Sequence, residues 1–381
     1  MAEALEYEDR QLSWSGRAVD IDHIEAELSK LRYLAAEESG GEGLAIRTSL
    51  VNVVVHAEDE DTAAAASRVI EELAGHHPSR ALIVIANPGH GESQVDASLA
   101  VHCHMASGMD QRVCCEEVTL RVSGPAAAHL HSIIVPLLIP DLPVAIWWTG
   151  AFPADTHGIE ELCSIADHFI IDSARFHNQI GDLSRVRSLA ELHQCAIGDL
   201  NYERTLPWRE LFERFTAPGG LGDWLGAIKS VEVRYADEWG HQTSGQAFLF
   251  LAWLAQRCGW DTSSVSAHGS QRLTIRYYET KIPAFLYPVG YEGVDRGWLV
   301  TIKVAFEDER GSAHLSLSRT GDPLHVTIRT EFADAVQVEH VRIEASDSPS
   351  ILTNQLDEAP HSREFTRLLT LAAPLIQASQ A

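Results

Sequence analysis

Two adjacent cysteines, Cys114 and Cys115, are the side chains most suggestive of chemistry in this sequence. They lie in a segment, residues 113–122, that is expected to form a strand. Because neighbouring side chains of a strand point to opposite faces, the two sulfurs should face apart, and a disulfide between them would strain the backbone. The pattern favours one buried and one partly exposed thiol, with a redox role as the alternative.

A pair of histidines, His102 and His104, precedes these cysteines and shares one face of a predicted strand. Either thiol of the cysteine pair could join them across a predicted hairpin and complete a zinc site. No CxxC or HxxxH spacing fixes the relative positions of these side chains. Satisfied polar or core residues are therefore the favoured interpretation, and the sequence predicts no metal and no cofactor.

Polar residues follow two predicted buried strands. Residues 87–93 (NPGHGES) lack the lysine of a GxxxxGK[ST] loop and lead into another predicted strand, so a simple turn is favoured over a phosphate site. Asp172, Ser173 and Arg175 follow the second strand, where open α/β sheets often bind ligands. Capping of the next helix by Asp172 or Ser173 is favoured there. The loop and this strand end support an alternative function, a sugar-phosphate sensor or enzyme.

Aromatic residues mark two places that suggest protein contacts. Trp147 and Trp148 end a predicted strand, residues 144–148, and must point to opposite faces, so one of them should pack at a second interface. Trp208 and Arg209 begin a polar helix, which is the composition of an interface hot spot, although core packing of Trp208 is an equal alternative. No GxSxG or HExxH motif is present, and the sequence predicts no enzyme.

The elements that must position these residues alternate between strands and helices. This alternation predicts an α/β (α+β) fold, with an N-terminal mixed sheet covered by helices in residues 21–228. Residues 1–20 are expected to be a flexible tail. Residues 229–381 are expected to form a mainly antiparallel domain with a terminal helix, and the polar residues 261–271 to form a connector.

Composition limits the classes of partner. The net charge of −25 repels nucleic acid and anionic lipid. Six cysteines are too few for a disulfide scaffold, and the N-terminus lacks the basic and apolar regions of a signal peptide. The longest apolar run, residues 133–148, is broken by three prolines and Asp141, so it is too short and interrupted to span a membrane. A cytoplasmic location is expected.

Several short segments occur together in the order and spacing of a known family. They are VCCEEVTLRVSG (113–124), LLIPDLPV (137–144) with Trp147 and Trp148, IDS (171–173), GDLN (198–201) and PWRE (207–210). In this combination the chain resembles the glucose-6-phosphate dehydrogenase assembly protein family, OpcA.

The resemblance implies a non-catalytic partner that binds glucose-6-phosphate dehydrogenase, promotes its active oligomer and raises NADPH production in the oxidative pentose phosphate pathway. We expect the contact surface at Trp147, Trp148, Trp208 and Arg209, because aromatic and arginine side chains dominate interfaces. Cyanobacterial relatives are regarded as thioredoxin-linked, so the resemblance also implies a redox role, with thioredoxin as a second partner, although the sequence has no CxxC motif.

Overall fold

The computed structural model describes most of the chain, as two compact units. The described residues are 12–38, 46–47, 49–74, 77–89, 91–105, 112–193, 195–218, 220–238, 244–269, 271–332, 335–344, 348–357 and 364–380. Unit 1 comprises residues 1–171, 191–198 and 348–362, and unit 2 comprises residues 172–190, 199–347 and 363–381.

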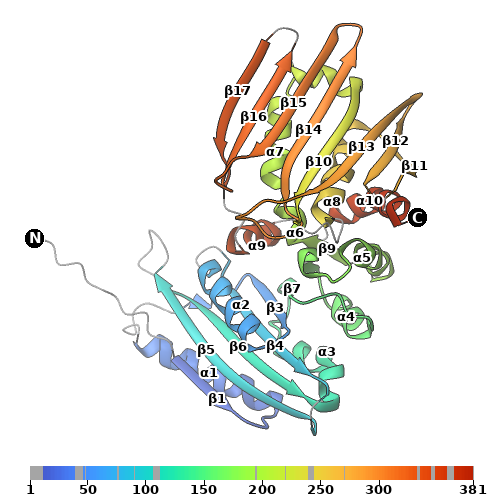
Figure 1. Cartoon of the computed structure of the whole chain (residues 1–381). Helices are drawn as coiled ribbons and strands as arrows, with labels where there is room; N and C mark the ends of the chain where they lie inside the picture. The colour runs from blue at the N-terminus through green and yellow to red at the C-terminus, as the bar shows by residue number, and fades with distance from the viewer. Residues whose placement is uncertain are drawn as a thin grey trace, which may run out of the picture. The chain divides into compact units, whose positions relative to one another are not determined.

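Unit 1 is built on a mixed sheet with the strand order β1-β5-β6-β4-β3-β7-β8-β9, and the short β2 pairs with β6 (Figure 1). The strands from β6 to β8 along this order are parallel, whereas β1 and β5 run antiparallel to their neighbours. The central strands are almost continuously buried, as expected for a parallel sheet covered on both faces. The strands are β1 (Leu12–Gly16), β2 (Ile46–Arg47), β3 (Val51–Ala57), β4 (Ser79–Asn87), β5 (Gln94–Met105), β6 (Arg112–Ser123), β7 (Val144–Trp148), β8 (His168–Ile171) and β9 (Ala196–Asp199).

Two helices of unit 1, α1 (Ile21–Glu38) and α2 (Glu60–Leu73), pack on this sheet. Helix α2 begins after Asp59, whose side chain accepts a hydrogen bond from the Thr62 amide, and it buries Ala63, Ala66, Ile70 and Leu73 at helical spacing. The other helical segments are η1 (Gly124–Ala128), α3 (Leu130–Ile134), η2 (Val135–Leu137), α4 (His157–Cys163) and α9 (Ser348–Asp357).

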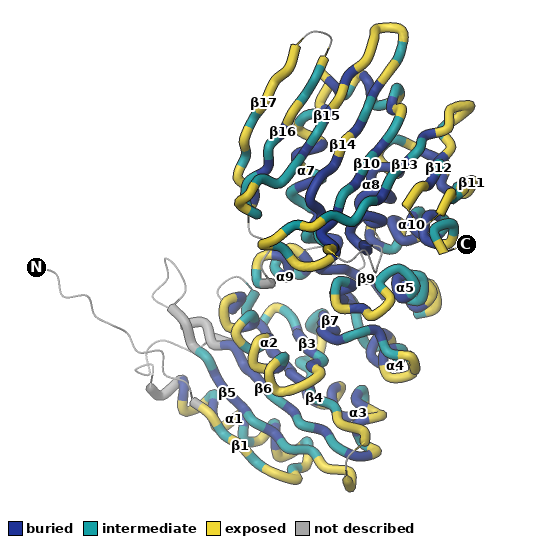
Figure 2. Tube along the Cα trace, viewed as in Figure 1, coloured by how far each residue is buried: buried dark blue, intermediate teal, exposed yellow. Residues whose placement is uncertain are grey.

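Unit 2 is built on an eight-stranded sheet with the order β11-β12-β13-β10-β14-β15-β16-β17. All its pairs are antiparallel except β10 with β13. The edge strand β17 is exposed along most of its length (Figure 2). The strands are β10 (Ile228–Ala236), β11 (Asp261–Ala267), β12 (Arg272–Tyr277), β13 (Thr280–Val289), β14 (Leu299–Asp308), β15 (Gly311–Arg319), β16 (His325–Phe332) and β17 (Ala335–Arg342).

The central helix of unit 2 is α8 (Gly245–Cys258), in which residues 245–255 are all buried. It packs against α10 (Glu364–Gln380) and β10. Gly259 ends α8 in the left-handed conformation (φ 66°) that favours glycine. The remaining helical segments are η3 (Ser173–Arg175), α5 (Gln179–His193), α6 (Leu200–Glu203), α7 (Leu206–Phe215) and η4 (Leu221–Ala227).

The predicted fold class is confirmed, and two details differ. Residues 12–16 of the expected tail form β1, because they complete the sheet beside β5. The expected connector at 261–271 contains β11, because its hydroxyl and β-branched side chains suit a strand paired with β12. By internal packing, residues 172–190 and 199–228 belong to unit 2 and residues 348–362 belong to unit 1, whereas a domain boundary at residue 228 stays a prediction.

Candidate functional site

Two of the family segments, IDS (171–173) and GDLN (198–201), contribute side chains to one buried cluster of unit 2. Asp199 ends β9, and its Oδ1 accepts hydrogen bonds from the amides of Ser173 (2.9 Å) and Asn201 (3.0 Å). The Ser173 hydroxyl donates to Asp199 Oδ2 at 2.6 Å. Neither Asp199 nor Ser173 has any exposed surface. The motifs IDS (171–173) and GDLN (198–201) are therefore two halves of one arrangement.

The cluster extends to the central helix and sheet of unit 2. Asn201 Nδ2 donates to Ser173 Oγ (3.0 Å), and Gln246 Nε2 donates to Asn201 Oδ1 (2.9 Å). The amide of Leu299 then donates to Gln246 Oε1 (3.0 Å). We call Ser173, Asp199, Asn201 and Gln246 the Asp199 network. It joins η3, α6, α8 and β14 through polar groups that satisfy one another, as buried polar groups must.

The carboxyl group of Asp199 has an unusual proton affinity. Burial raises its pKa from 3.8 to about 7, against the hydrogen bonds from Ser173 and Asn201, and the charge of Asp172 adds to the increase. A carboxyl with this pKa could exchange a proton near neutral pH. Because Asp199 and Ser173 are completely buried, a substrate has no access to either, and the network acts as a clamp between segments.

A charged pair lies beside the network. Arg204 holds Asp172 by two hydrogen bonds, of 2.6 and 2.8 Å, and its guanidinium lies 5.7 Å from the centre of the Trp298 ring. Both charged side chains are about nine-tenths buried. Asp172 also accepts a hydrogen bond from the Ala174 amide and caps η3, which confirms the predicted capping role. Arg175 is 57% exposed and lies 3.9 Å from Asp172.

The predicted contact residues in β7 are buried in unit 1. Trp147 is 7% exposed and Trp148 is 8% exposed, and each lies on its own face of the strand. The Trp148 ring stacks on His56 with 3.8 Å between ring centres, and its indole donates to the carbonyl of Ala151. Both faces of β7 are therefore interior. Contact of these two residues with a partner stays a prediction.

Of the predicted contact residues in α7, Trp208 is buried in unit 2 and Arg209 is partly buried. Trp208 is 1% exposed, and the Arg319 guanidinium lies 5.3 Å from its ring centre. Arg209 lies 4.0 Å above the Tyr202 ring and donates to its hydroxyl at 2.9 Å. Burial lowers the pKa of Arg319 to about 10. The core-packing alternative for Trp208 is confirmed, whereas a role in partner contact stays a prediction.

The structure brings together two cysteines, Cys163 and Cys195, that the sequence analysis did not connect. Cys115 is buried and burial raises its pKa, which is typical of an inert thiol. The side chains of Cys114 and His104 lie outside the described residues. Cys163 donates a hydrogen bond to the Cys195 sulfur, which, with burial, raises the pKa of Cys163. Both thiols are buried and free, and no sequence spacing indicates their contact.

The other sequence candidates serve as local structure or lie apart. The loop at 87–93 joins β4 to β5, and Ser93 Oγ accepts from the Ala126 amide, so the turn interpretation is confirmed; His90 lies outside the described residues. His102 lies 3.9 Å from Glu71. The zinc set of His102, His104 and a cysteine, which the sequence left as an alternative, includes His104, whose side chain lies outside the described residues. Side chains with metal-ligand chemistry gather elsewhere, at His129, His157 and Glu161. Sequence reasoning missed this group, although His157 and Glu161 have the helical spacing that signals a shared face.

Taken together, the fold and the Asp199 network define a two-unit α/β protein with a buried polar network in unit 2. In the part of the chain that the structure describes, no helix is long and apolar enough to cross a membrane.

Comparison with protein families agrees with this class. Residues 70–188 match the model of the glucose-6-phosphate dehydrogenase subunit N-terminal domain, and residues 195–368 match the model of the C-terminal domain. The chain belongs to the OpcA family of glucose-6-phosphate dehydrogenase assembly proteins.

Curated relatives point the same way. A putative OxPP cycle protein OpcA from Synechocystis sp. is 30% identical over 201 residues, which are 52% of this chain and 41% of that protein. The OpcA protein from Synechococcus elongatus is 25% identical over 245 residues, covering 62% and 54% respectively. The chain thus spans about half the length of these relatives. The comparisons give no support to thioredoxin as a partner.

Solved structures add nothing about function. KijD10, a 3-ketoreductase from Actinomadura kijaniata solved in complex with NADP, is 11% identical and has a TM-score of 0.47, with 86% of this chain and 96% of that chain covered. A likeness of this size supports no conclusion about the activity of this chain.

Proposed function

We propose that this chain binds glucose-6-phosphate dehydrogenase and favours its active oligomer, without catalysing a reaction itself. The observation that carries the proposal is the pair of family matches, described as the N-terminal and C-terminal domains of a glucose-6-phosphate dehydrogenase subunit. The matches cover sequence from both units, so the proposal concerns both units and not one short segment.

The buried state of the Asp199 network supports a non-catalytic role. Asp199 and Ser173 are inaccessible, and the Asp172 carboxylate is held by Arg204. These groups are occupied in joining segments of unit 2. A rigid surface that presents a fixed shape to a partner benefits from such internal clamping, because less conformational freedom is lost on binding.

Activation of this kind has a simple energetic requirement. The chain must bind the active form of the enzyme more tightly than the inactive form, and a preference of about 1.4 kcal/mol shifts that equilibrium roughly tenfold. The net charge of −25 would speed association with a basic patch on the enzyme. The association rate should therefore fall as salt is added.

An exposed apolar edge in unit 2 suits a first contact. Strand β17 ends the sheet order, and its Val336 and Val338 are 53% and 52% exposed. Phe332, at the end of the paired strand β16, is 48% exposed. Edge strands with free backbone groups commonly accept a strand or loop from a partner. We therefore propose β17 as a contact surface, in addition to the contact residues predicted from the sequence, Trp147, Trp148, Trp208 and Arg209.

The direct test combines the two purified proteins. We expect co-migration in size-exclusion chromatography with light scattering, a larger enzyme oligomer and a higher rate of NADPH formation. Separate migration together with an unchanged rate would contradict the proposal. Repeating the assay over a range of salt concentrations tests the electrostatic contribution separately.

Variants locate the contact surface. Val336→Lys and Val338→Lys should weaken binding at least tenfold, because each places a charge in the proposed interface. Val135→Lys is the matched control, since Val135 is 44% exposed and lies in unit 1. The four residues predicted from the sequence need a different design, because three are buried and Arg209 is partly buried, so alanine would disturb packing. Arg209→Lys keeps the charge but loses the planar stack on Tyr202, and weaker binding with an unchanged circular dichroism spectrum would support its predicted role.

A further inference from the structure

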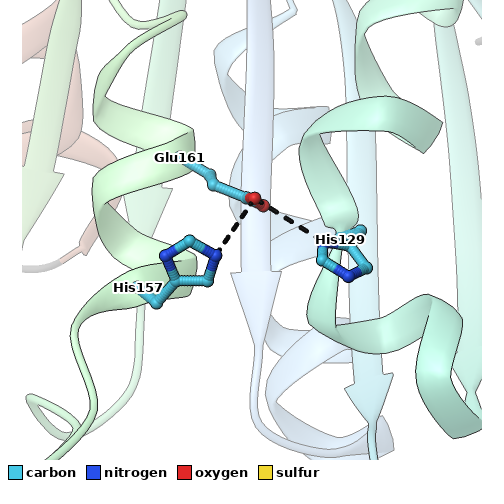
Figure 3. Close-up of side chains that lie close together, drawn as sticks. All are labelled: His129, His157 and Glu161. Carbon is cyan, nitrogen blue, oxygen red and sulfur yellow. Dashed lines mark ion pairs between the residues drawn. The ribbon is translucent and has the colours of Figure 1, made fainter.

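Two histidines and a glutamate of unit 1 converge on a common point (Figure 3). His157 and Glu161 lie one turn apart on α4, with 3.4 Å between His157 Nε2 and Glu161 Oε1. His129, which immediately precedes α3, places its Nδ1 3.6 Å from the same oxygen. The three ligand atoms all lie within 4.8 Å of one another.

These separations fit a shared cation better than hydrogen bonds. A direct N–H···O bond has a length of about 2.7–3.2 Å, which is shorter than either histidine-to-glutamate distance. Zinc bonds of about 2.0–2.1 Å in tetrahedral geometry place neighbouring ligand atoms about 3.3 Å apart. The observed 3.4 and 3.6 Å are close to this value. Small side-chain rotations would complete the geometry.

A fourth side chain gives independent support. His131 Nδ1 and Glu161 Oε2 are buried atoms without a hydrogen-bond partner among the described residues, and they lie 3.8 Å apart. An unsatisfied buried carboxylate oxygen is costly. A cation bound to Glu161 would offset this cost, and His131 could then bind the second carboxylate oxygen or the metal through water.

We propose that His129, His157 and Glu161 bind one zinc ion, with His131 as a supporting group. Imidazole nitrogen together with carboxylate oxygen is a donor set for zinc and other transition metals, whereas magnesium and calcium prefer oxygen alone. Three protein ligands leave one position for water. Because the ligands come from α4 and the start of α3, the ion would join two helical segments that pack together in unit 1.

The chain provides a matched control for this site. His23 and Glu27 have the same helical spacing on α1, with 3.6 Å between Nε2 and Oε1. Lys30 also contacts Glu27 and already supplies a positive charge. In the described part of the chain, no third metal-ligating side chain joins this pair. His23→Ala should therefore leave zinc binding unchanged.

The test uses the purified full chain alone, so its outcome does not depend on the proposed dehydrogenase partner. After treatment with EDTA, the protein is titrated with Zn²⁺ in competition with a chromophoric chelator. We expect saturable binding of one ion per chain, weakened at least tenfold in His157→Ala and in Glu161→Gln. Bound Co²⁺ should give the strong visible absorption of tetrahedral coordination. Zn²⁺ should raise the Tm of the wild type and of His23→Ala, but not that of His157→Ala or Glu161→Gln.

Each contrary outcome would overturn the proposal. Absence of saturable zinc binding, or equal affinity in the wild type and both variants, would exclude the site. Equal losses in His23→Ala and His157→Ala would show nonspecific histidine binding. Circular dichroism of the metal-free variants identifies misfolding, and His129→Ala provides a third ligand variant that lies outside α4.

Discussion

The two units bury ionisable side chains that respond to pH in opposite directions. In unit 1, burial lowers the pKa of His56 and of His168 to about 4. In unit 2, burial raises the pKa of Asp199 to about 7. Both changes have the same physical cause, which is the cost of placing a charge in a medium of low polarity. The comparison shows that burial, acting on a base and on an acid, gives contributions to stability with opposite pH dependence.

Whether each contribution to stability is lost in acid or in base depends on which protonation state the folded protein favours. His56 and His168 are neutral when folded, so their contribution to stability is present above about pH 6.5 and is lost as pH falls towards 4. Asp199 is favoured in its protonated form, so its contribution is complete below about pH 4 and is lost as pH rises through 7. Acid should therefore weaken the contributions of His56 and His168 and strengthen that of Asp199 over the same range.

The strongest way to separate the units is to remove a core aromatic of unit 2. Trp208→Ala should lower the free energy of unfolding of unit 2 by about 3–5 kcal/mol, because the ring is almost completely buried. Hydrogen exchange, read by mass spectrometry, should accelerate in peptides from β14 and β15 and remain slow in β3. The control is Tyr278→Ala, at a tyrosine of unit 2 that is 82% exposed. Equal acceleration in both units would show that they unfold as one.

Asp199→Asn should flatten the pH dependence of unit 2. The wild type should lose up to about 4 kcal/mol between pH 4 and pH 7, whereas asparagine has no charge to bury. Asparagine can still accept the hydrogen bonds from the Ser173 and Asn201 amides. Urea unfolding monitored by exchange in β14 measures the effect. A wild-type profile that is already flat in this range would contradict the raised pKa.

His56→Phe should reduce the acid sensitivity of unit 1. Between pH 6.5 and 4 the unfolded state of the wild type binds a proton at His56 and the folded state does not, so the free energy of unfolding should fall by up to about 3 kcal/mol. A phenyl ring keeps a stack on Trp148 without a titrating group. His168 should retain its own acid response in this variant. Unfolding monitored in β3 and β7 at several pH values gives the slope of the free energy of unfolding against pH. An unchanged slope would mean that His56 is hydrated when folded.

The sequence predicts the architecture well because hydrophobic periodicity is a local property. Buried runs such as residues 144–148 and the alternation in residues 231–235 predict their strands. Strand β1 is missed because its five residues carry too weak a pattern and depend on pairing with β5. Strand β11 is missed because serine and threonine usually indicate loops, whereas here they pair with β12.

The candidate site is predictable only in part. Capping by Asp172 follows from its position after a strand, which is a local signal. The hydrogen bonds of Asp199 with Ser173 depend on where β8 and β9 lie in the sheet, and no local pattern contains that information. Burial of Trp208 and Arg209 could not be distinguished from exposure, because tryptophan and arginine are common both in interfaces and in stacked cores.

The smallest expected effect compares an exposed ion pair with a buried one inside unit 1. Arg121 and Glu60 form two hydrogen bonds, but their side chains are 41% and 60% exposed, so Arg121→Gln should cost less than about 1 kcal/mol and even less in high salt. Arg80 and Glu116 are only 3% and 2% exposed, and Arg80→Gln should cost about 3–5 kcal/mol because it leaves Glu116 buried with weaker compensation. Chemical unfolding at low and high salt measures both. A large, salt-independent loss in Arg121→Gln would mean that the contribution of ion pairs in this unit is set by something other than burial.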